Sequence, residues 1–278
     1  MKLSALLTEA FARLNPATRT RYQHVWTGFA LEAKIIDLPA LKALNGRGLE
    51  KVLDVMLTKY APATVALTLA AVRCVVRKGV QLDALPKDST VGVKVPVGDN
   101  VPRNNVLLAG ELEKLAKALP LGTLERAVVL ALALQGLRRA ELCAATWGDV
   151  KKGSDGRLEL HLVGKGGKPA VLGLQPLVLK AVQAWAGTET CGAPNAPFIA
   201  ATPGVPLDEQ QVYRMVNQIT LKHLGHRATP HGLRATFGSD VIARKGIEVA
   251  RQLMRHSSIN TTVRYSRWLA TRDDDRTL

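Results

Sequence analysis

Several kinds of residue and segment are scarce in this chain, and each scarcity excludes a class of protein. Its 278 residues include only three cysteines, an odd number at spacings that match no zinc site. This favours a reduced, cytosolic compartment over a secreted, disulfide-bonded fold, and we expect no metal site. The longest apolar run, residues 127–134, is far too short to cross a bilayer. Residues 1–14 carry charges and lack a small-residue cleavage site, so they predict an amphipathic helix and not a signal peptide.

Acidic side chains are also scarce relative to basic ones. The 38 lysines and arginines outnumber the 23 aspartates and glutamates, which leaves a net charge of +15 and a pI near 10. Residues 1–100 carry 14 basic and 8 acidic side chains, and residues 101–278 carry 24 and 15, so both parts of the chain are basic. This balance favours a polyanionic partner, either a nucleic acid or an anionic membrane surface. With 47% apolar residues, the chain is long enough for one large domain or two ordinary ones.

Hydrophobic spacing near the N-terminus predicts a small domain of about four helices. Helices are expected at residues 1–14, 18–33, 49–61 and 62–78. Residues 85–105 contain proline, glycine and asparagine without a helical period, which is typical of a linker. The predicted boundaries are a helical domain at 1–90, a linker at 91–105 and a second domain at 106–278.

The second domain is predicted to be mainly helical with one hairpin. In residues 156–174 the period changes from 3.6 to 2, with Leu158, Leu160 and Leu162 in alternation before a GKGG turn, which indicates a β-hairpin. Residues 187–206 are rich in proline and glycine and predict a loop. Helices are expected at 109–119, 123–135, 176–186, 207–223, 232–245, 247–255 and 260–270. The predicted fold class is mainly α with a small antiparallel β-sheet.

Chemically useful side chains are concentrated in a few short segments. His231 and Arg234 are three residues apart at the start of a predicted helix, which places them on one face of it. Arg138 and Glu141 repeat this geometry at the start of another helix. Lys165 lies at the tip of the predicted hairpin, where a flexible ammonium can reach into a cleft. Each residue alone has an ordinary explanation, such as a helix cap or a surface ion pair.

Together with two residues nearer the C-terminus, these side chains meet the needs of phosphodiester exchange without a metal ion. Such a reaction requires a nucleophile, charge stabilisation for the non-bridging oxygens and a proton for the departing alkoxide. The two guanidiniums fit phosphate oxygens bidentately and stay charged. The phenol of Tyr265 can attack with help from His231, and Lys165 can protonate the leaving oxygen. His256 can donate a hydrogen bond to the phosphate. Rejoining would need no ATP, and the sequence has no GxxxxGK[ST] loop.

The four segments that hold these residues closely resemble, in sequence and order, the signature motifs of the tyrosine recombinases, the phage integrase family. They are GLRRAEL, GKGGK, HGLR and RHSSINTTVRY. The resemblance extends over nearly the whole chain and implies an N-terminal helical core-binding domain, SAM-like in fold, and a C-terminal catalytic domain. It further implies a cofactor-independent site-specific recombinase or integrase that acts as a homotetramer on two double-stranded DNA sites. Cleavage and rejoining would pass through a transient 3′-phosphotyrosyl bond.

The resemblance also assigns roles to individual residues. The implied catalytic set is Arg138, Lys165, His231, Arg234, His256 and Tyr265, with Tyr265 as the nucleophile. Glu141 falls on a commonly acidic position that supports the active-site histidine. The residues expected to contact DNA from the first domain are Thr18, Arg19, Arg21, Thr64, Arg73, Arg77 and Lys78, although their basic members are also consistent with a solvated surface.

One departure from the family pattern lies beside the expected site. Where the family usually has Leu-Gly-His, this chain has Met254, Arg255 and His256, so a bulky cation replaces a small residue. The cation either perturbs local packing or adds a phosphate contact. Two alternative functions stay open at this point: a type IB topoisomerase, and a catalytically idle DNA-binding regulator of the same fold.

Overall fold

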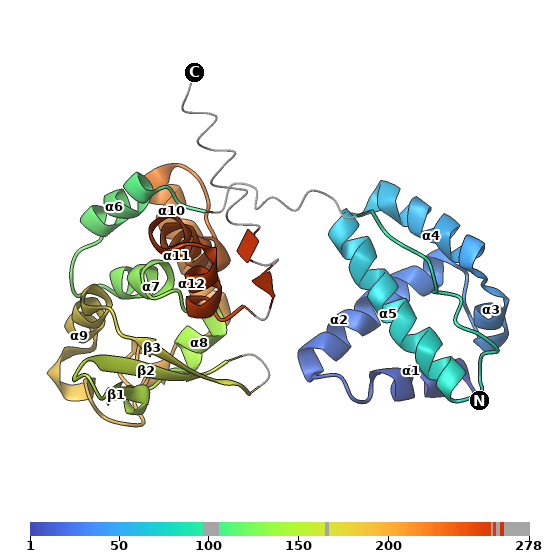
Figure 1. Cartoon of the computed structure of the whole chain (residues 1–278), viewed down its shortest axis with the longest axis horizontal. Helices are drawn as coiled ribbons and strands as arrows, with labels where there is room; N and C mark the ends of the chain where they lie inside the picture. The colour runs from blue at the N-terminus through green and yellow to red at the C-terminus, as the bar shows by residue number, and fades with distance from the viewer. Residues whose placement is uncertain (97–105, 165–166, 257, 260–261, 264–278) are drawn as a thin grey trace, which may run out of the picture. The chain divides into compact units, whose positions relative to one another are not determined.

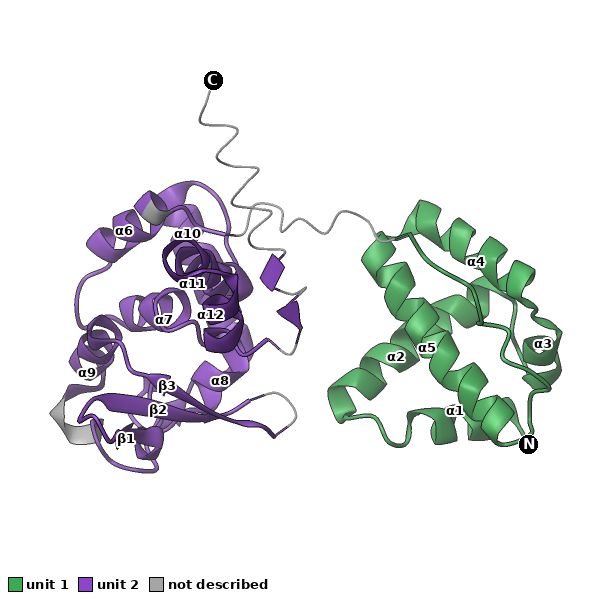
Figure 2. Cartoon of the chain, viewed as in Figure 1, with its two compact units in different colours: residues 1–100 green, residues 101–278 purple. Residues whose placement is uncertain are grey.

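The chain forms two compact units, residues 1–100 and 101–278, each with a hydrophobic core of its own (Figure 2). The structure is a computed structural model, and it describes residues 1–96, 106–164, 167–256, 258–259 and 262–263 (Figure 1). No helix in these ranges is long and apolar enough to cross a membrane.

The first unit contains five helices in its described part. They are α1 (Leu3–Phe11), α2 (Pro16–Glu32), α3 (Leu38–Ala43), α4 (Gly46–Lys59) and α5 (Pro62–Gln81). Asn15, Asp37 and Asn45 each accept a backbone N–H in the first turn of α2, α3 or α4, which explains where these helices begin. Helix α5 packs against α1, α2 and α4 (Figure 1). The expectation of about four helices missed α3, which is too short to show an apolar period.

The segment that precedes the undescribed residues 97–105 packs with the first unit. Val93 is 2% exposed and belongs to the core that also contains Phe29 and Val72. Residues 91–96, which form the first part of the predicted linker at 91–105, therefore contribute to the first unit.

The second unit is arranged around a buried helix. Its helices are α6 (Ala109–Ala118), α7 (Leu124–Ala133), α8 (Arg139–Ala144), the 3-10 helix η1 (Trp147–Asp149), α9 (Pro176–Thr190), α10 (Glu209–Leu224), α11 (Pro230–Lys245) and α12 (Ile247–Leu253). Every residue of α7 from 127 to 133 is buried, and this helix packs against α9 and α11. The longest apolar run of the sequence is thus a core helix.

The predicted hairpin forms, and a third strand extends it. Strands β1 (Val150–Lys152), β2 (Leu158–Val163) and β3 (Pro169–Gly173) make an antiparallel sheet in that order. Leu160 pairs with Leu172, and both are buried together with Leu162, so the alternation places leucines on the core face. A second, two-stranded sheet of β4 (Ala200–Thr202) and β5 (Val205–Pro206) lies where a loop was expected. These strands are too short to show a period of 2.

The fold class predicted from the sequence is confirmed, since the described chain is mainly helical with small antiparallel sheets. The helices expected at 109–119, 123–135, 207–223 and 232–245 all form, with ends that differ by one or two residues. The helix expected at 260–270 lies largely outside the described residues.

Candidate active site

The segment GLRRAEL folds as a tight turn followed by α8. Gly136 has a φ of 64°, and a Cβ there would lie 2.3 Å from the ring of Phe237, so the turn requires glycine. Arg138 is the N-cap of α8, and the Glu141 carboxylate accepts its backbone N–H at 2.8 Å. The same carboxylate accepts a hydrogen bond from Nη1 of Arg138 at 2.6 Å. The predicted spacing of three residues therefore produces an ion pair at a helix start.

Helix α11 supplies the second arginine. Thr229 caps this helix, and Arg234 projects from its second turn with only 3% of its surface exposed. Its guanidinium donates hydrogen bonds to the backbone carbonyls of Gly136 and Met254. Its Nη1 also lies 4.0 Å from Oε2 of Glu141. Arg234 thus links the start of α11, the turn before α8 and the end of α12.

Helix α12 ends in a turn that directs backbone carbonyls at these arginines. The N–H of Arg255 donates to the carbonyl of Gln252 at 2.9 Å, and the N–H of His256 donates to that of Arg251 at 3.0 Å. This is a Schellman motif in which Arg255, with φ of 55°, occupies the position usually held by glycine. The left-handed conformation costs a non-glycine residue about 1–2 kcal/mol. Nη2 of Arg138 donates to the carbonyl of Arg255 at 3.0 Å.

Glu141 is a buried carboxylate surrounded by guanidiniums. Its side chain is 4% exposed, and in addition to Arg138 and Arg234 it has Arg255, whose Nη2 donates to Oε2. Burial alone would raise the pKa of Glu141, but the backbone hydrogen bond from Arg138 and the charges of Arg255 and Arg138 together lower it. The carboxylate therefore stays ionised, and three cations around one anion leave an excess of positive charge that suits a phosphate.

Two histidines lie within the field of these cations. Loss of hydration and the charges of Arg234 and Arg138 lower the pKa of His231, although part of the residue remains exposed. Loss of hydration and the same charges lower the pKa of His256 to about 4. Both imidazoles are thus neutral at pH 7, so each can accept a proton on one nitrogen and donate from the other.

Sequence reasoning missed one group that contacts His256. Nδ1 of His256 lies 2.9 Å from Oγ1 of Thr262, which is fully buried. The only sequence signal for this contact is the spacing of six residues within the motif RHSSINTTVRY, which does not by itself indicate a hydrogen bond.

The described structure brings together four of the six predicted catalytic residues, namely Arg138, His231, Arg234 and His256. Lys165 and Tyr265 lie outside the described residues. The hydrogen bonds of Glu141 described above are with arginines, and its support of a histidine stays a prediction. Among the described residues, no group of three or more His, Cys, Asp and Glu side chains is arranged to hold a metal ion.

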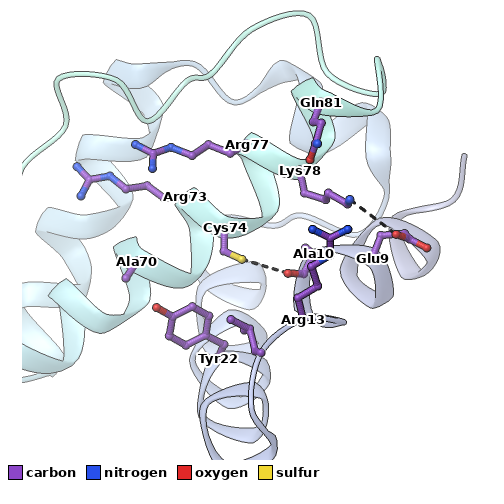
Figure 3. A pocket seen from close by; sticks show the side chains of 11 residues that line it. Glu9, Ala10, Arg13, Tyr22, Ala70, Arg73, Cys74, Arg77, Lys78 and Gln81 are labelled. Atoms are coloured by element: carbon purple, nitrogen blue, oxygen red, sulfur yellow. Dashed lines mark hydrogen bonds and ion pairs between the residues drawn. The ribbon is translucent and has the colours of Figure 1, made fainter. Parts of the chain in front are cut away.

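The candidate DNA-contacting cations of α5 line a pocket of about 540 Å³ in the first unit (Figure 3). Lys78 pairs with Glu9 at 3.8 Å across the pocket, and Arg77 pairs with Asp88 at 3.4 Å. Arg73 donates a hydrogen bond to a backbone carbonyl of the loop after α5. Arg77 nevertheless keeps 68% of its side chain exposed, so it remains accessible to an anion.

The remaining candidate DNA contacts lie in two helix starts. Thr18 and Thr64 belong to the first turns of α2 and α5, and Arg21 is exposed on α2. Arg19 differs, because its guanidinium donates to three carbonyls at the C-terminal end of α1 and in the loop after it, at 2.7 to 3.3 Å. It therefore caps a neighbouring helix, a structural role that its place in the sequence did not reveal.

The sequence profile of the phage integrase family matches residues 105–272. This match covers more than half of the chain, so the chain belongs to the phage integrase family, and the resemblance found in the sequence is confirmed.

Curated relatives carry the name tyrosine recombinase XerC. The protein of Xylella fastidiosa is 29% identical over 149 residues, which are 53% of this chain and 49% of the relative. The match thus spans about half the length of that relative. The XerC of Myxococcus xanthus is 25% identical over 252 residues, which are 84% of this chain and 82% of the relative.

Solved structures of the same fold include two recombinases bound to DNA. A lambda integrase dimer bound to a COC′ core site has a TM-score of 0.72 at 18% identity, covering 95% of this chain and 77% of that one. The XerH site-specific recombinase in a post-cleavage complex with a palindromic difH substrate has a TM-score of 0.68 at 17% identity, covering 85% and 72%. These similarities show the fold.

Proposed function

We propose that this chain is a site-specific DNA recombinase that cleaves and rejoins double-stranded DNA through a 3′-phosphotyrosyl intermediate, without a metal ion or ATP. The observation that carries the proposal is the convergence of Arg138 and Arg234 with two neutral histidines in a member of the phage integrase family. In such a site the arginines supply the positive charge that a metal ion supplies in many nucleases.

The proposed cleavage is a balanced exchange of one phosphodiester for another. The phenol oxygen of Tyr265 attacks phosphorus, a tyrosyl P–O bond forms, and the bond from phosphorus to the 5′ oxygen breaks. The phenol has an ordinary pKa of about 10, so it must lose its proton as it attacks. Neutral His231 accepts that proton, and Lys165 gives a proton to the departing 5′ oxygen. Attack by a 5′ hydroxyl of another strand reverses these steps and rejoins the DNA.

The charge that develops on phosphate is stabilised by groups that are already oriented. The guanidiniums of Arg138 and Arg234 are held by backbone carbonyls of the turn after α12, so little reorganisation accompanies the reaction. If the Thr262 hydroxyl donates to Nδ1 of His256, the single proton of the neutral ring is on Nε2. From there it can donate to a non-bridging oxygen.

The proposed partners are double-stranded DNA and further copies of the same chain. Solved structures of this fold include a lambda integrase tetramer bound to a Holliday junction, with a TM-score of 0.69. By analogy, four copies of this chain would join two DNA sites in the host cytosol. The first unit would act as the core-binding domain, with the exposed cations of α2 and α5 meeting backbone phosphates.

The decisive experiment uses nicked duplexes tiled over the DNA that flanks the gene. A nick a few nucleotides to the 3′ side of the cleavage point lets the short fragment that bears the new 5′ hydroxyl diffuse away, so the covalent adduct accumulates and the attached residue can be mapped. We expect the adduct on Tyr265, its formation in the presence of EDTA, and its absence in Tyr265→Phe with DNA binding unchanged. An adduct that persists in Tyr265→Phe would refute the proposed nucleophile, and loss of cleavage in EDTA would indicate a metal nuclease.

Plasmid relaxation and strand exchange, measured beside the trapping assay, separate the two alternatives. A type IB topoisomerase would relax supercoiled plasmids that carry none of the cleaved sequences, whereas a recombinase is expected to exchange strands only between two copies of a cleaved site. An idle regulator would bind one of the tiled duplexes and form no adduct with any of them.

A further inference from the structure

Arg255 is a largely buried cation in a backbone conformation that arginine rarely adopts. Its φ is 55°, and 13% of its side chain is exposed. A glycine would complete the same Schellman turn without strain. A bulky, charged side chain retained at such a position indicates a function beyond ending a helix.

The guanidinium of Arg255 is directed at Glu141, 114 residues away in the sequence. Nη2 donates to Oε2 of the carboxylate, and Nη1 donates to the carbonyl of Leu253 at 3.3 Å. Glu141 also accepts from the backbone and the guanidinium of Arg138. The guanidiniums of Arg138 and Arg255 thus bind the same carboxylate. Arg255 helps to fix the position of Glu141, and Glu141 in turn orients Arg138.

The backbone of the same turn holds Arg138 from the other side. Nη2 of Arg138 donates to the carbonyls of Arg255 at 3.0 Å and Met254 at 3.4 Å, and the latter carbonyl also accepts from Arg234. The φ of Arg255 sets the plane of the peptide bond that carries the Met254 carbonyl. The turn therefore fixes an acceptor that both arginines use.

We propose that Arg255 is a positioning residue of the active site, which orients the Arg138 guanidinium through the shared carboxylate of Glu141. The expected effect of Arg255 on the cleavage rate rests on the proposed function. Its charge also offsets that of Glu141, so the cluster of Arg138, Glu141 and Arg255 keeps a net positive charge for the phosphate.

The kinetic test separates the side chain from the turn. Arg255→Gly keeps the left-handed turn and removes the guanidinium, whereas Arg255→Lys keeps the charge. We expect Arg255→Gly to slow adduct formation at saturating DNA by about 10- to 100-fold. DNA affinity should not fall, the chain should stay folded under the assay conditions, and Arg255→Lys should restore part of the rate. The matched control is Arg157→Gly, which removes a cation that is 87% exposed in the same unit and should cleave at the parent rate.

A second variant tests whether the effect passes through the carboxylate. In a Glu141→Gln background, Arg255→Gly should cause no additional loss of rate, because the link between the two arginines is already weakened. Equal losses in both backgrounds would mean that Arg255 acts on the DNA directly and would overturn the proposal. A parent rate in Arg255→Gly would overturn it as well.

A measurement without DNA tests the positioning role of Arg255 independently of the proposed function. The guanidinium ¹⁵N signals of Arg138, assigned with Arg138→Lys, should be resolved in the full chain and in Arg157→Gly, and should shift and broaden in Arg255→Gly. Unchanged signals would refute the positioning role. A signal change in a chain that forms no adduct with any duplex would support the positioning role and refute the recombinase.

Discussion

The two units of this protein differ in whether they bury charged side chains. In the first unit, the buried polar residues of the described part are the neutral Thr68 and Thr90, and its ions lie at or near the surface. The second unit buries Glu141 and Arg234, which are 5% and 3% exposed. Burial of ions costs free energy that pairing only partly returns, whereas exposed pairs cost little. Under the proposed function, the buried ions of the second unit would serve the chemistry and the exposed ions of the first unit would contact DNA.

The largest expected effect follows from removal of a buried cation. Arg234→Ala should lower the rate of adduct formation by several decades, each worth about 1.4 kcal/mol of barrier. It should also lower the free energy of unfolding by about 3–5 kcal/mol, because Glu141 and two backbone carbonyls lose a partner. Single-turnover cleavage and urea unfolding measure both quantities.

The matched substitution in the first unit is Arg77→Ala. It removes an exposed ion pair with Asp88 and should change the free energy of unfolding by less than about 1 kcal/mol. Similar losses of stability in Arg77→Ala and Arg234→Ala would contradict the contrast between the units.

A pair of core substitutions tests whether the two cores are energetically separate. Phe29 and Phe198 are both fully buried, and each lies beside a tryptophan, with ring centroids 5.8 Å from Trp26 and 5.2 Å from Trp147. Replacing either phenylalanine by alanine should cost about 3–5 kcal/mol in its own unit.

Tryptophan fluorescence during urea unfolding measures this, with the other three of the four tryptophans replaced by Phe so that Trp26 or Trp147 alone reports. We expect Phe29→Ala to shift the Trp26 transition alone and Phe198→Ala to shift the Trp147 transition alone. If either substitution moved both transitions equally, the units would unfold as one.

The pH dependence of cleavage tests whether positive charges crowd His231 in the second unit. His231 must be neutral to accept the proton of Tyr265, and its pKa lies below the ordinary value near 6.5. Protonation, and with it the loss of rate, is therefore expected only below pH 6.5. Cleavage measured at subsaturating DNA reports the free protein, so the acid limb of that profile should have its midpoint below 6.5. A midpoint at or above 6.5 would contradict the proposed base.

The smallest effect distinguishes two neighbouring arginines of the first unit. Arg21→Ala should reduce the salt dependence of DNA binding by a slope of about 0.9 if it contacts one phosphate, with little change in stability. Arg19→Ala should leave that slope unchanged and lower the free energy of unfolding by about 1 kcal/mol, because it caps α1. Titrations at several salt concentrations, together with urea unfolding, would reveal the reverse pattern if the assignment is wrong.

Local signals in the sequence predicted most of the fold. The hydrophobic spacing of residues 18–33 predicted α2, and the alternating leucines of β2 predicted the hairpin. The short α3, β4 and β5 could not be predicted, since two to six residues are too few for a period to emerge. For the site, the spacing predicted that Arg138 and Glu141 share one face at a helix start, and in the structure the two side chains form an ion pair there.

The sequence by itself determined which chemical groups are available, their order and their local geometry, because helix caps, amphipathic periods and three-residue spacings act over one or two turns. Only the tertiary structure decided that Arg255 pairs with Glu141, that Arg19 caps α1, and that His231 and His256 lie among cations that keep them neutral. These outcomes depend on burial and on contacts between segments distant in the chain. Neither is encoded in the local pattern around any one residue.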